Sequence, residues 1–276
     1  MKNCQKQEKP NRGFSLQERD KRLLVDLFAS RVMSRDQIIE TGYFSSVPRA
    51  NNRLAMLVRQ GFVSRYLHET RGAGSQALYR AGRKAKSIVA GGLGYESETV
   101  SVQLGQGEAP MHLEHTLGLV DLRVLFEAGA KECLLKEFTW LPEALCHHEY
   151  LVSFGHNQWQ RRDVRPDAVA MWQGDDGKRV TFIELDLGHV SSKKYAGKVA
   201  SYRQYQSDGA FEAVYEASSF TVLTITTGSL RLKHLKKLCH GNSFHFTTFS
   251  KLKQLGPFQL QWETRGGFAS ILGECR

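Results

Sequence analysis

The segment from Arg161 to Tyr205 decides the fold of the C-terminal part of this chain: RRDVRPDAVAMWQGDDGKRVTFIELDLGHVSSKKYAGKVASYRQY. Apolar runs at 164–172 and 180–187 are typical of strands, and the GDDG stretch between them is a strong turn signal. A helical pattern follows the second strand. The segment therefore predicts two strands and a helix. Within this apolar sequence it places four charged residues, Asp167, Glu184, Asp186 and Lys198.

The second strand predicts a buried pair of carboxylates. Because side chains alternate along a strand, Glu184 and Asp186 share a face with Phe182. Two neighbouring buried carboxylates repel each other and lose hydration, so they need a cation, a proton or a basic partner. If Asp167 on the preceding strand reaches the same point, three acidic groups converge. Oxygen ligands of this kind suit Mg²⁺ or Mn²⁺.

The helix after this strand offers the basic partner. Lys198 shares a helical face with Tyr195 and Tyr202, which we expect to pack toward the sheet, whereas Lys193 projects to the opposite side. Two interpretations remain open for this set of charges. One is a metal-dependent catalytic site, and the other is a buried ion-pair network without catalysis.

Residues 14–90 predict a winged helix-turn-helix domain. Start signals for three helices occur at Ser15, Ser34 and Ser46. The third helix ends at Gly61, and alternating sequence at 62–69 and 76–80 around a glycine turn predicts a β-hairpin. In a winged helix the third helix lies in the major groove of duplex DNA and the hairpin lies along the backbone.

Basic charge is concentrated in the same region. Residues 1–90 hold 18 Lys/Arg and 7 Asp/Glu, whereas residues 91–276 hold 20 and 21. This asymmetry points to a polyanion, and double-stranded DNA is the expected partner. A solvated helix face and a winged helix that binds protein are the alternatives. The candidate DNA contacts on the third helix and the hairpin are Arg49, Asn52, Arg53, Arg59, Arg65, Arg71 and Arg80.

Four segments make up the predicted domain organisation. They are a disordered leader (1–13), the winged helix-turn-helix (14–90), a Gly-rich linker (91–110) and an α/β (α+β) domain with a mixed sheet (111–276). The last domain opens with a predicted helix at 111–128 that carries Glu114. We interpret its neighbours His112 and His115 as surface or capping groups. The sequence from 141 to 160 predicts no regular element.

Cysteine and hydropathy patterns exclude other classes of protein. No window approaches eighteen uninterrupted apolar residues, and the charged N-terminus lacks the core of a secretory signal, so we expect a cytoplasmic protein without a membrane span. Five scattered cysteines favour free thiols in a reducing compartment. Cys146, His147 and His148 point in different directions because they are consecutive, so we expect a polar loop there and not a metal site.

The motifs resemble a known family. The order of a helix with a glutamate, a strand, a strand with Pro-Asp, a strand with Glu-x-x and a helix is similar to the PD-(D/E)xK nuclease-like fold. With RPDA at 165–168, FIELD at 182–186, K-x-x-x-Y from Lys198 and a winged helix in front, the chain more closely resembles the replication-relaxation family. That family comes from plasmids and other mobile elements, and the resemblance covers about residues 15–250.

The resemblance implies roles for individual residues. Asp167 and Glu184 would be metal ligands, Asp186 occupies the position of the nuclease lysine, Lys198 would supply that lysine from the next helix, and Glu114 matches an extra glutamate on the first helix. The implied activity is a Mg²⁺- or Mn²⁺-dependent DNA endonuclease. The alternative is a non-catalytic replication or transcription factor that uses the nuclease fold as a scaffold. Homodimerisation and contacts with other mobile-element proteins are further expectations.

Overall fold

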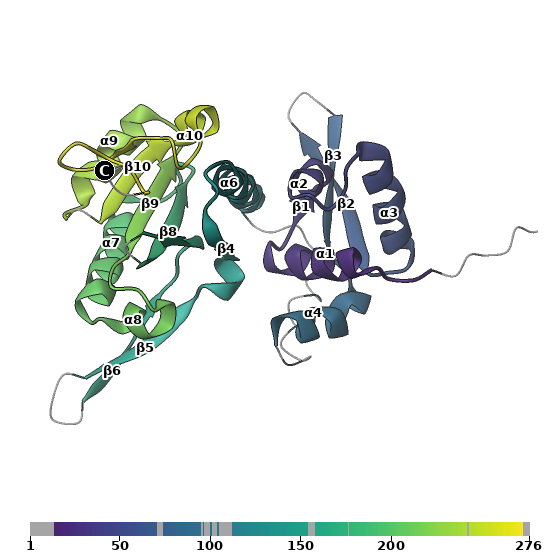
Figure 1. Ribbon diagram of the computed structural model, residues 1–276, viewed down its shortest axis with the longest axis horizontal. Coiled ribbons are helices and arrows are strands. Elements are labelled where there is room, and N and C mark those ends of the chain that lie inside the picture. The colour runs from purple at the N-terminus through teal and green to yellow at the C-terminus, as the bar shows by residue number, and fades with distance from the viewer. Residues whose placement is uncertain are drawn as a thin grey trace, which may run out of the picture.

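The computed structural model describes residues 14–70, 74–94, 96, 100, 104, 112–153, 158–175, 177–241 and 243–272. Figure 1 shows two parts, a smaller one with a three-stranded sheet and a larger one built on a central sheet. This mixture of helices and a large mixed sheet confirms the predicted fold class. The predicted leader and most of the predicted linker lie outside the described residues. Among the described residues, no helix combines the length and apolar character needed to cross a bilayer.

The smaller part has the layout of a winged helix-turn-helix. Its elements are α1 (Glu18–Ala29), β1 (Met33–Ser34), α2 (Arg35–Glu40), α3 (Val47–Arg59), β2 (Val63–Thr70) and β3 (Gly74–Ala81), followed by the 3-10 turn η1 (Arg83–Ala85) and α4 (Lys86–Leu93). β2 and β3 form the predicted hairpin, and β1 adds a third antiparallel strand on the far side of β3.

Two of the three predicted helix starts are confirmed. The Ser34 hydroxyl accepts from the Gln37 N–H at 3.2 Å, and the Gln37 side chain accepts from the Ser34 N–H at 3.0 Å. This reciprocal pair is a capping box that fixes the start of α2. Ser46 is the N-cap of α3, which has proline in its first turn.

The predicted start of the first helix at Ser15 is wrong, because α1 is capped by Gln17. The Gln17 N–H donates to the Asp20 carboxylate at 2.7 Å. Asp20 is fully buried, and its charge is met by Arg53 of α3, which forms an ion pair with it and stacks over the Phe14 ring. Asp20 therefore both caps the N-terminus of α1 and links α1 to α3.

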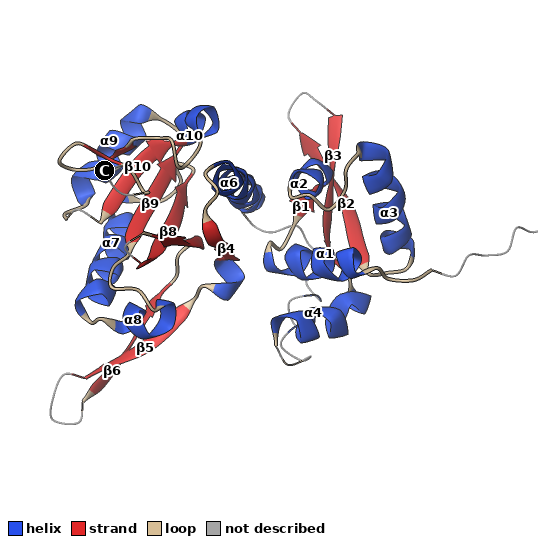
Figure 2. Ribbon diagram, in the orientation of Figure 1, coloured by secondary structure: helices blue, strands red, loops and turns tan. Residues whose placement is uncertain are grey.

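The larger part has three layers around a seven-stranded sheet (Figure 2). Its strands are β4 (Lys136–Pro142), β7 (Ala168–Gly174), β8 (Gly177–Asp186), β9 (Thr221–Thr226), β10 (Phe244–Thr248), β11 (Trp262–Glu263) and β12 (Phe268–Ala269). Its helices are α6 (Leu113–Glu132), α7 (Ser192–Ser207), α8 (Ala210–Tyr215), α9 (Ser229–Leu238) and α10 (Phe249–Leu255). The order is β12-β11-β10-β9-β8-β7-β4, with β8, β9 and β10 parallel.

The two faces of β8 belong to different hydrophobic cores. Phe182 packs with Tyr202 of α7 in the core that α7, α8 and α9 cover, whereas Ile183 and Leu185 pack in the core that α6 and α10 cover. The face assignment made from strand periodicity is therefore confirmed. It leaves Glu184 on the α7 side of the sheet.

Helix α6 lies between the two parts and has two apolar faces. Leu122 and Phe126 pack against the sheet, whereas Val120 belongs to the core of the winged helix-turn-helix. A Cβ atom at Gly118 would lie 2.8 Å from the Leu185 side chain, so glycine permits the close approach of α6 to β8. This helix therefore joins the two cores.

Polar contacts reinforce the junction at α6. Arg123 pairs with Asp26 of α1 at 2.8 Å, and Asp26 also accepts from the Tyr43 hydroxyl at 2.6 Å. The Gln37 amide donates to Asp121 at 2.7 Å. These buried or half-buried bonds hold the winged helix-turn-helix against α6.

The region expected to be irregular contains regular elements. They are the 3-10 turn η2 (Glu143–Leu145) and an antiparallel hairpin of β5 (His148–Ser153) and β6 (Trp159–Val164). Val164 ends β6, so the strand predicted from that residue begins instead at Ala168. The hairpin pairs only with itself within the described residues, and its polar sequence carries little of the apolar alternation that marks a sheet strand.

Arg53→Ala should strongly destabilise the chain, because it leaves the Asp20 carboxylate buried without a counter-charge. Removing one partner of a buried ion pair costs about 3–5 kcal/mol. Arg49→Ala, on the exposed side of the same helix, is the matched control and should change the free energy of unfolding by less than about 0.5 kcal/mol. Urea denaturation measures both. Equal losses in the two variants would contradict a structural role for Arg53.

Candidate functional site

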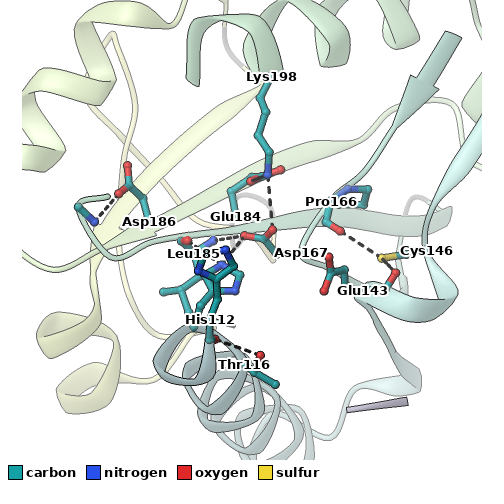
Figure 3. A network of polar contacts seen from close by, with 12 residues as sticks. His112, Thr116, Glu143, Cys146, Pro166, Asp167, Glu184, Leu185, Asp186 and Lys198 are labelled. Carbon is teal, nitrogen blue, oxygen red and sulfur yellow. Dashed lines mark hydrogen bonds and ion pairs between the residues drawn. The ribbon is translucent and has the colours of Figure 1, made fainter. Parts of the chain in front are cut away.

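A buried cluster of two carboxylates and one lysine lies between β7, β8 and α7 (Figure 3). Asp167 directly precedes β7, Glu184 lies on β8 and Lys198 lies on α7. The Lys198 ammonium forms an ion pair with Glu184 and lies 3.5 Å from Asp167 Oδ1. The two carboxylate side chains are only 13% and 6% exposed. The structure thus brings together three of the four charged residues that the sequence singled out.

Glu184 is held from two directions. Its Oε1 atom accepts from the Tyr202 hydroxyl at 2.6 Å, and its Oε2 atom pairs with Lys198. Burial, followed by the charge of Asp167, raises the pKa of Glu184 to about 7. Burial and Asp167 therefore favour the protonated form of Glu184, and the charge of Lys198 and the hydrogen bonds from Lys198 and Tyr202 offset them only in part.

Asp167 is ionised in the same cluster. Its Oδ2 atom accepts from the Leu185 N–H at 2.8 Å and lies 3.2 Å from His115 Nε2. Burial opposes ionisation, but the hydrogen bond from His115 and the charge of Lys198 together hold the pKa of Asp167 below its ordinary value. The pKa of Asp167 is therefore lowered and the pKa of Glu184 is raised, although both carboxylates contact the same ammonium group.

The sequence analysis missed the role of His115. Its Nε2 atom also lies 3.0 Å from the Leu185 carbonyl oxygen, so the ring is anchored at the cluster and is not a surface group as expected. His115 lies three, seven and eleven residues before Gly118, Leu122 and Phe126, which follow the sheet-facing side of α6. That helical spacing was the feature of the sequence that could have placed His115 on the side of α6 that faces the sheet. Glu114, one residue earlier, is exposed and does not join the cluster.

Asp186 is turned to a different partner from the one predicted. Its Oδ2 atom accepts from Arg231 of α9 at 2.6 and 3.0 Å, and its Oδ1 atom accepts from the Gly188 N–H at 2.6 Å. The predicted convergence of three carboxylates is therefore corrected to two. Sequence reasoning did not anticipate Arg231, because the pair spans 45 residues of chain.

Asp167 and Glu184 fit the small donor set of a divalent cation. Within the described residues, no three His, Cys, Asp or Glu side chains converge as a protein-only metal site would need. Mg²⁺, however, usually keeps several waters and takes one or two carboxylates together with substrate phosphate. Asp167 and Glu184 match that donor type and number, and Asp186 takes no part.

Cys146 and His148 of the Cys146-His147-His148 cluster each bond to another part of the larger domain. Cys146 is buried, and its thiol donates to the Pro166 carbonyl at 3.4 Å. Burial raises the pKa of this thiol well above its ordinary value. His148 is not in a loop as expected, because it begins β5 and bonds the Tyr205 hydroxyl at 2.6 Å.

The candidate DNA contacts separate into four groups. Exposed side chains on α3 and β2 are Arg49, Asn52, Arg59 and Arg65. Arg53 is only 13% exposed and is engaged by Asp20, which favours a structural role for it. Arg71 lies outside the described residues. Arg80 faces the cavity described next.

The cluster opens into a cavity of about 1420 Å³ between the two parts of the chain. Asp167, Glu184 and Lys198 line one side of it. Leu27 and Phe28 of α1 line it from the winged helix-turn-helix. The carboxylates and residues of the winged helix-turn-helix therefore line the same cavity.

Lys198→Met should destabilise the chain at pH 8, because it keeps the length of the side chain but removes the ammonium that Asp167 and Glu184 share. The expected loss is about 3–5 kcal/mol. Lys193→Met, on the exposed side of the same helix, should cost less than about 0.5 kcal/mol. Chemical denaturation of both variants makes the comparison. A small effect of Lys198→Met would show that the carboxylates do not depend on this cation.

His115 should make stability depend on pH near neutrality. Burial lowers the pKa of His115, but the hydrogen bond and charge of Asp167 outweigh it and raise the pKa above its ordinary value. Stability from the charged ring is therefore fully present below about pH 6.5 and is lost as the pH rises through the folded-state pKa. His115→Gln should cost more at pH 6 than at pH 8.5 in denaturant titrations. His68→Gln in β2 is the control, and a pH-independent cost of His115→Gln would contradict the pairing.

Comparison with known proteins places the chain in a family. The family model described as replication-relaxation matches residues 24–219, which include Asp167, Glu184 and Lys198. No curated protein matches the chain. The family description suggests a role in the replication or relaxation of plasmids or other mobile elements. The match covers well over half of the chain and agrees with the resemblance seen in the motifs, so this chain belongs to the replication-relaxation family.

Proposed function

We propose that the chain is a metal-dependent DNA endonuclease that nicks or cuts DNA during replication, relaxation or transfer of a mobile element. The observation that carries this proposal is the position of Lys198. Its ammonium approaches Glu184 and Asp167 from α7 and supplies the cation that the strand motif lacks at Asp186. Lys198 of α7 thus offsets the absence of a lysine at position 186, where the nuclease pattern has one.

Asp167 and Glu184 are the residues that would hold Mg²⁺ or Mn²⁺. When bound, such a cation supplies Lewis-acid stabilisation of charge and lowers the pKa of a bound water. The carboxylates suit this role because they are buried and close enough to share one ammonium. The Leu185 N–H and the His115 ring fix the orientation of Asp167.

Lys198 would stabilise the phosphodiester as negative charge develops on it. Burial lowers the pKa of Lys198, but the charges of Glu184 and Asp167 outweigh it and raise the pKa above its ordinary value, so the ammonium keeps its proton at neutral pH. The side chain is 31% exposed, which leaves it accessible from the cavity. A fixed cation beside the scissile phosphate lowers the barrier to hydrolysis.

The winged helix-turn-helix would bring the protein to duplex DNA. Its helix α3 exposes Arg49, Asn52 and Arg59, and β2 exposes Arg65. These residue types bind base edges and phosphates. Binding of duplex DNA at α3, homodimerisation and contacts with other mobile-element proteins stay predictions.

A specific observation favours a second candidate function, a DNA-binding replication or transcription factor without catalysis. Every carboxylate oxygen of Asp167 and Glu184 already has a hydrogen-bond donor or an ammonium partner. Such a satisfied network is also what a structural ion-pair cluster would show. The two candidates differ in whether the site hydrolyses DNA.

Supercoiled plasmid incubated with the protein and Mn²⁺ should be converted to nicked or linear DNA. Glu184→Gln and Lys198→Ala should each reduce the rate at least about 100-fold, because one removes a metal ligand and the other removes the fixed cation. Lys193→Ala is the matched control on α7 and should cut at the unmodified rate. Gel electrophoresis of the products measures the rates.

Circular dichroism of each variant separates loss of activity from loss of folding. Equal cleavage by folded Glu184→Gln and the unmodified protein would remove the site from the reaction. Absence of cleavage by the unmodified protein, with intact duplex binding, would favour the non-catalytic candidate.

A further inference from the structure

The shape of the cavity bears on which form of DNA reaches the carboxylates. The cavity holds about 1420 Å³, and Asp167, Glu184 and Lys198 lie on its wall. Small-molecule pockets are usually about 300–1,000 Å³, so this space exceeds what a single small ligand fills. It is therefore suited to a short stretch of polymer.

The opposite wall is formed by the winged helix-turn-helix. Leu27, Phe28 and Arg31 come from the end of α1 and the turn after it, and Arg80 comes from the end of β3. The bonds of Arg123 and Gln37 across the junction hold this wall in place beside α6. Both parts of the chain therefore contribute to the lining of the cavity.

One turn of a DNA duplex is much larger than this cavity. Groove depths of about 7.5–8.5 Å imply a duplex radius on the order of 10 Å, so one turn of about 34 Å occupies on the order of 10⁴ Å³ and holds about 20 nucleotides. A cavity of about 1420 Å³ accommodates roughly three nucleotides at that density. An unpaired strand of a few nucleotides matches the available space.

The charges on the cavity wall suit a phosphate backbone. Each carboxylate that lines it has a cationic partner: Asp167 and Glu184 share Lys198, Asp186 pairs with Arg231 and Glu143 pairs with Arg31. Further cationic side chains on the wall are Arg80, Lys194 and Arg165, the last of which pairs with Asp163. Lys194 is exposed on the first turn of α7, beside the cluster. A positively charged groove that follows the backbone is the usual means of binding a single strand.

The candidate duplex-binding helix does not face this cavity. In Figure 1, α3 lies on the side of the winged helix-turn-helix away from the larger part, whereas α1 lies nearer to it. Residues of α3 are absent from the described cavity lining. A duplex that lies on α3 and a strand that lies at the carboxylates would therefore occupy separate surfaces.

We propose that the cavity binds single-stranded DNA, so that the strand to be cut enters unpaired while α3 holds neighbouring duplex. This inference rests on the proposed function, because it names the substrate of the same site. It makes the chain specific for DNA that is locally open, such as a melted or displaced strand. Phosphate contacts at Lys194, Arg165 and Arg80 guide that strand to Asp167 and Glu184.

Binding can be tested without hydrolysis. Glu184→Gln protein in EDTA is titrated into fluorescein-labelled (dT)12 and into a labelled 24-base-pair duplex, and fluorescence anisotropy reports both affinities. Adding Lys194→Ala should weaken (dT)12 binding about three- to tenfold and leave duplex binding within about twofold, because each lost phosphate contact removes one favourable charge interaction. Adding Arg49→Ala should instead weaken duplex binding about three- to tenfold and leave (dT)12 binding within about twofold.

Three results would overturn the proposal. The first is that Arg49→Ala weakens the binding of (dT)12 and of the duplex equally. The second is that Lys194→Ala leaves the affinity for (dT)12 unchanged. The third is that r(U)12 binds more tightly than (dT)12. Plasmid nicking by the unmodified protein is scored separately. If nicking is absent but the two variants affect the two ligands as expected, the hydrolytic function fails and the single-strand site stands. If nicking occurs without that pattern, the single-strand inference fails alone.

Discussion

Two carboxylates buried side by side determine much of the architecture around them. Removing an ion from water costs several kcal/mol even after the protein relaxes, and two like charges add their repulsion. Asp167 and Glu184 are tolerable in the core only because Lys198 meets both and because Tyr202, His115 and a backbone N–H satisfy their remaining oxygens. The cluster therefore requires α6, β8 and α7 to meet at one point.

Helix α6 connects this requirement to the rest of the chain. One of its faces packs on the sheet and brings His115 to Asp167, and the other packs on the winged helix-turn-helix. Gly118 lets the helix approach β8 closely enough for the histidine to reach. Because Arg123 of the same helix pairs with Asp26, the position of the smaller part and the geometry of the carboxylate cluster depend on one element. A displacement of the smaller part would therefore change the geometry of the carboxylate cluster, and a change in the cluster would displace the smaller part.

Features with short-range causes could be predicted from the sequence. The capping box at Ser34 and the two faces of β8 follow from spacing within one element, and the orientation of Lys198 follows from helical periodicity. His115, Arg231 and the role of Arg53 depend on partners 33 or more residues away. Their local sequence permits several orientations, so only the assembled core selects one.

Asp186 stands where the resemblance to nucleases implies a lysine, and its charge is met outside the carboxylate cluster. A lysine at this position would point at Arg231 of α9, and two cations in a half-buried site would repel each other. With aspartate there, Arg231 gains a partner and the ammonium is supplied by Lys198 from α7. Charge is balanced in two separate pairings, one between β8 and α9 and one between β8 and α7. Asp186 therefore belongs to a different ion pair from the one that Lys198 makes with Glu184.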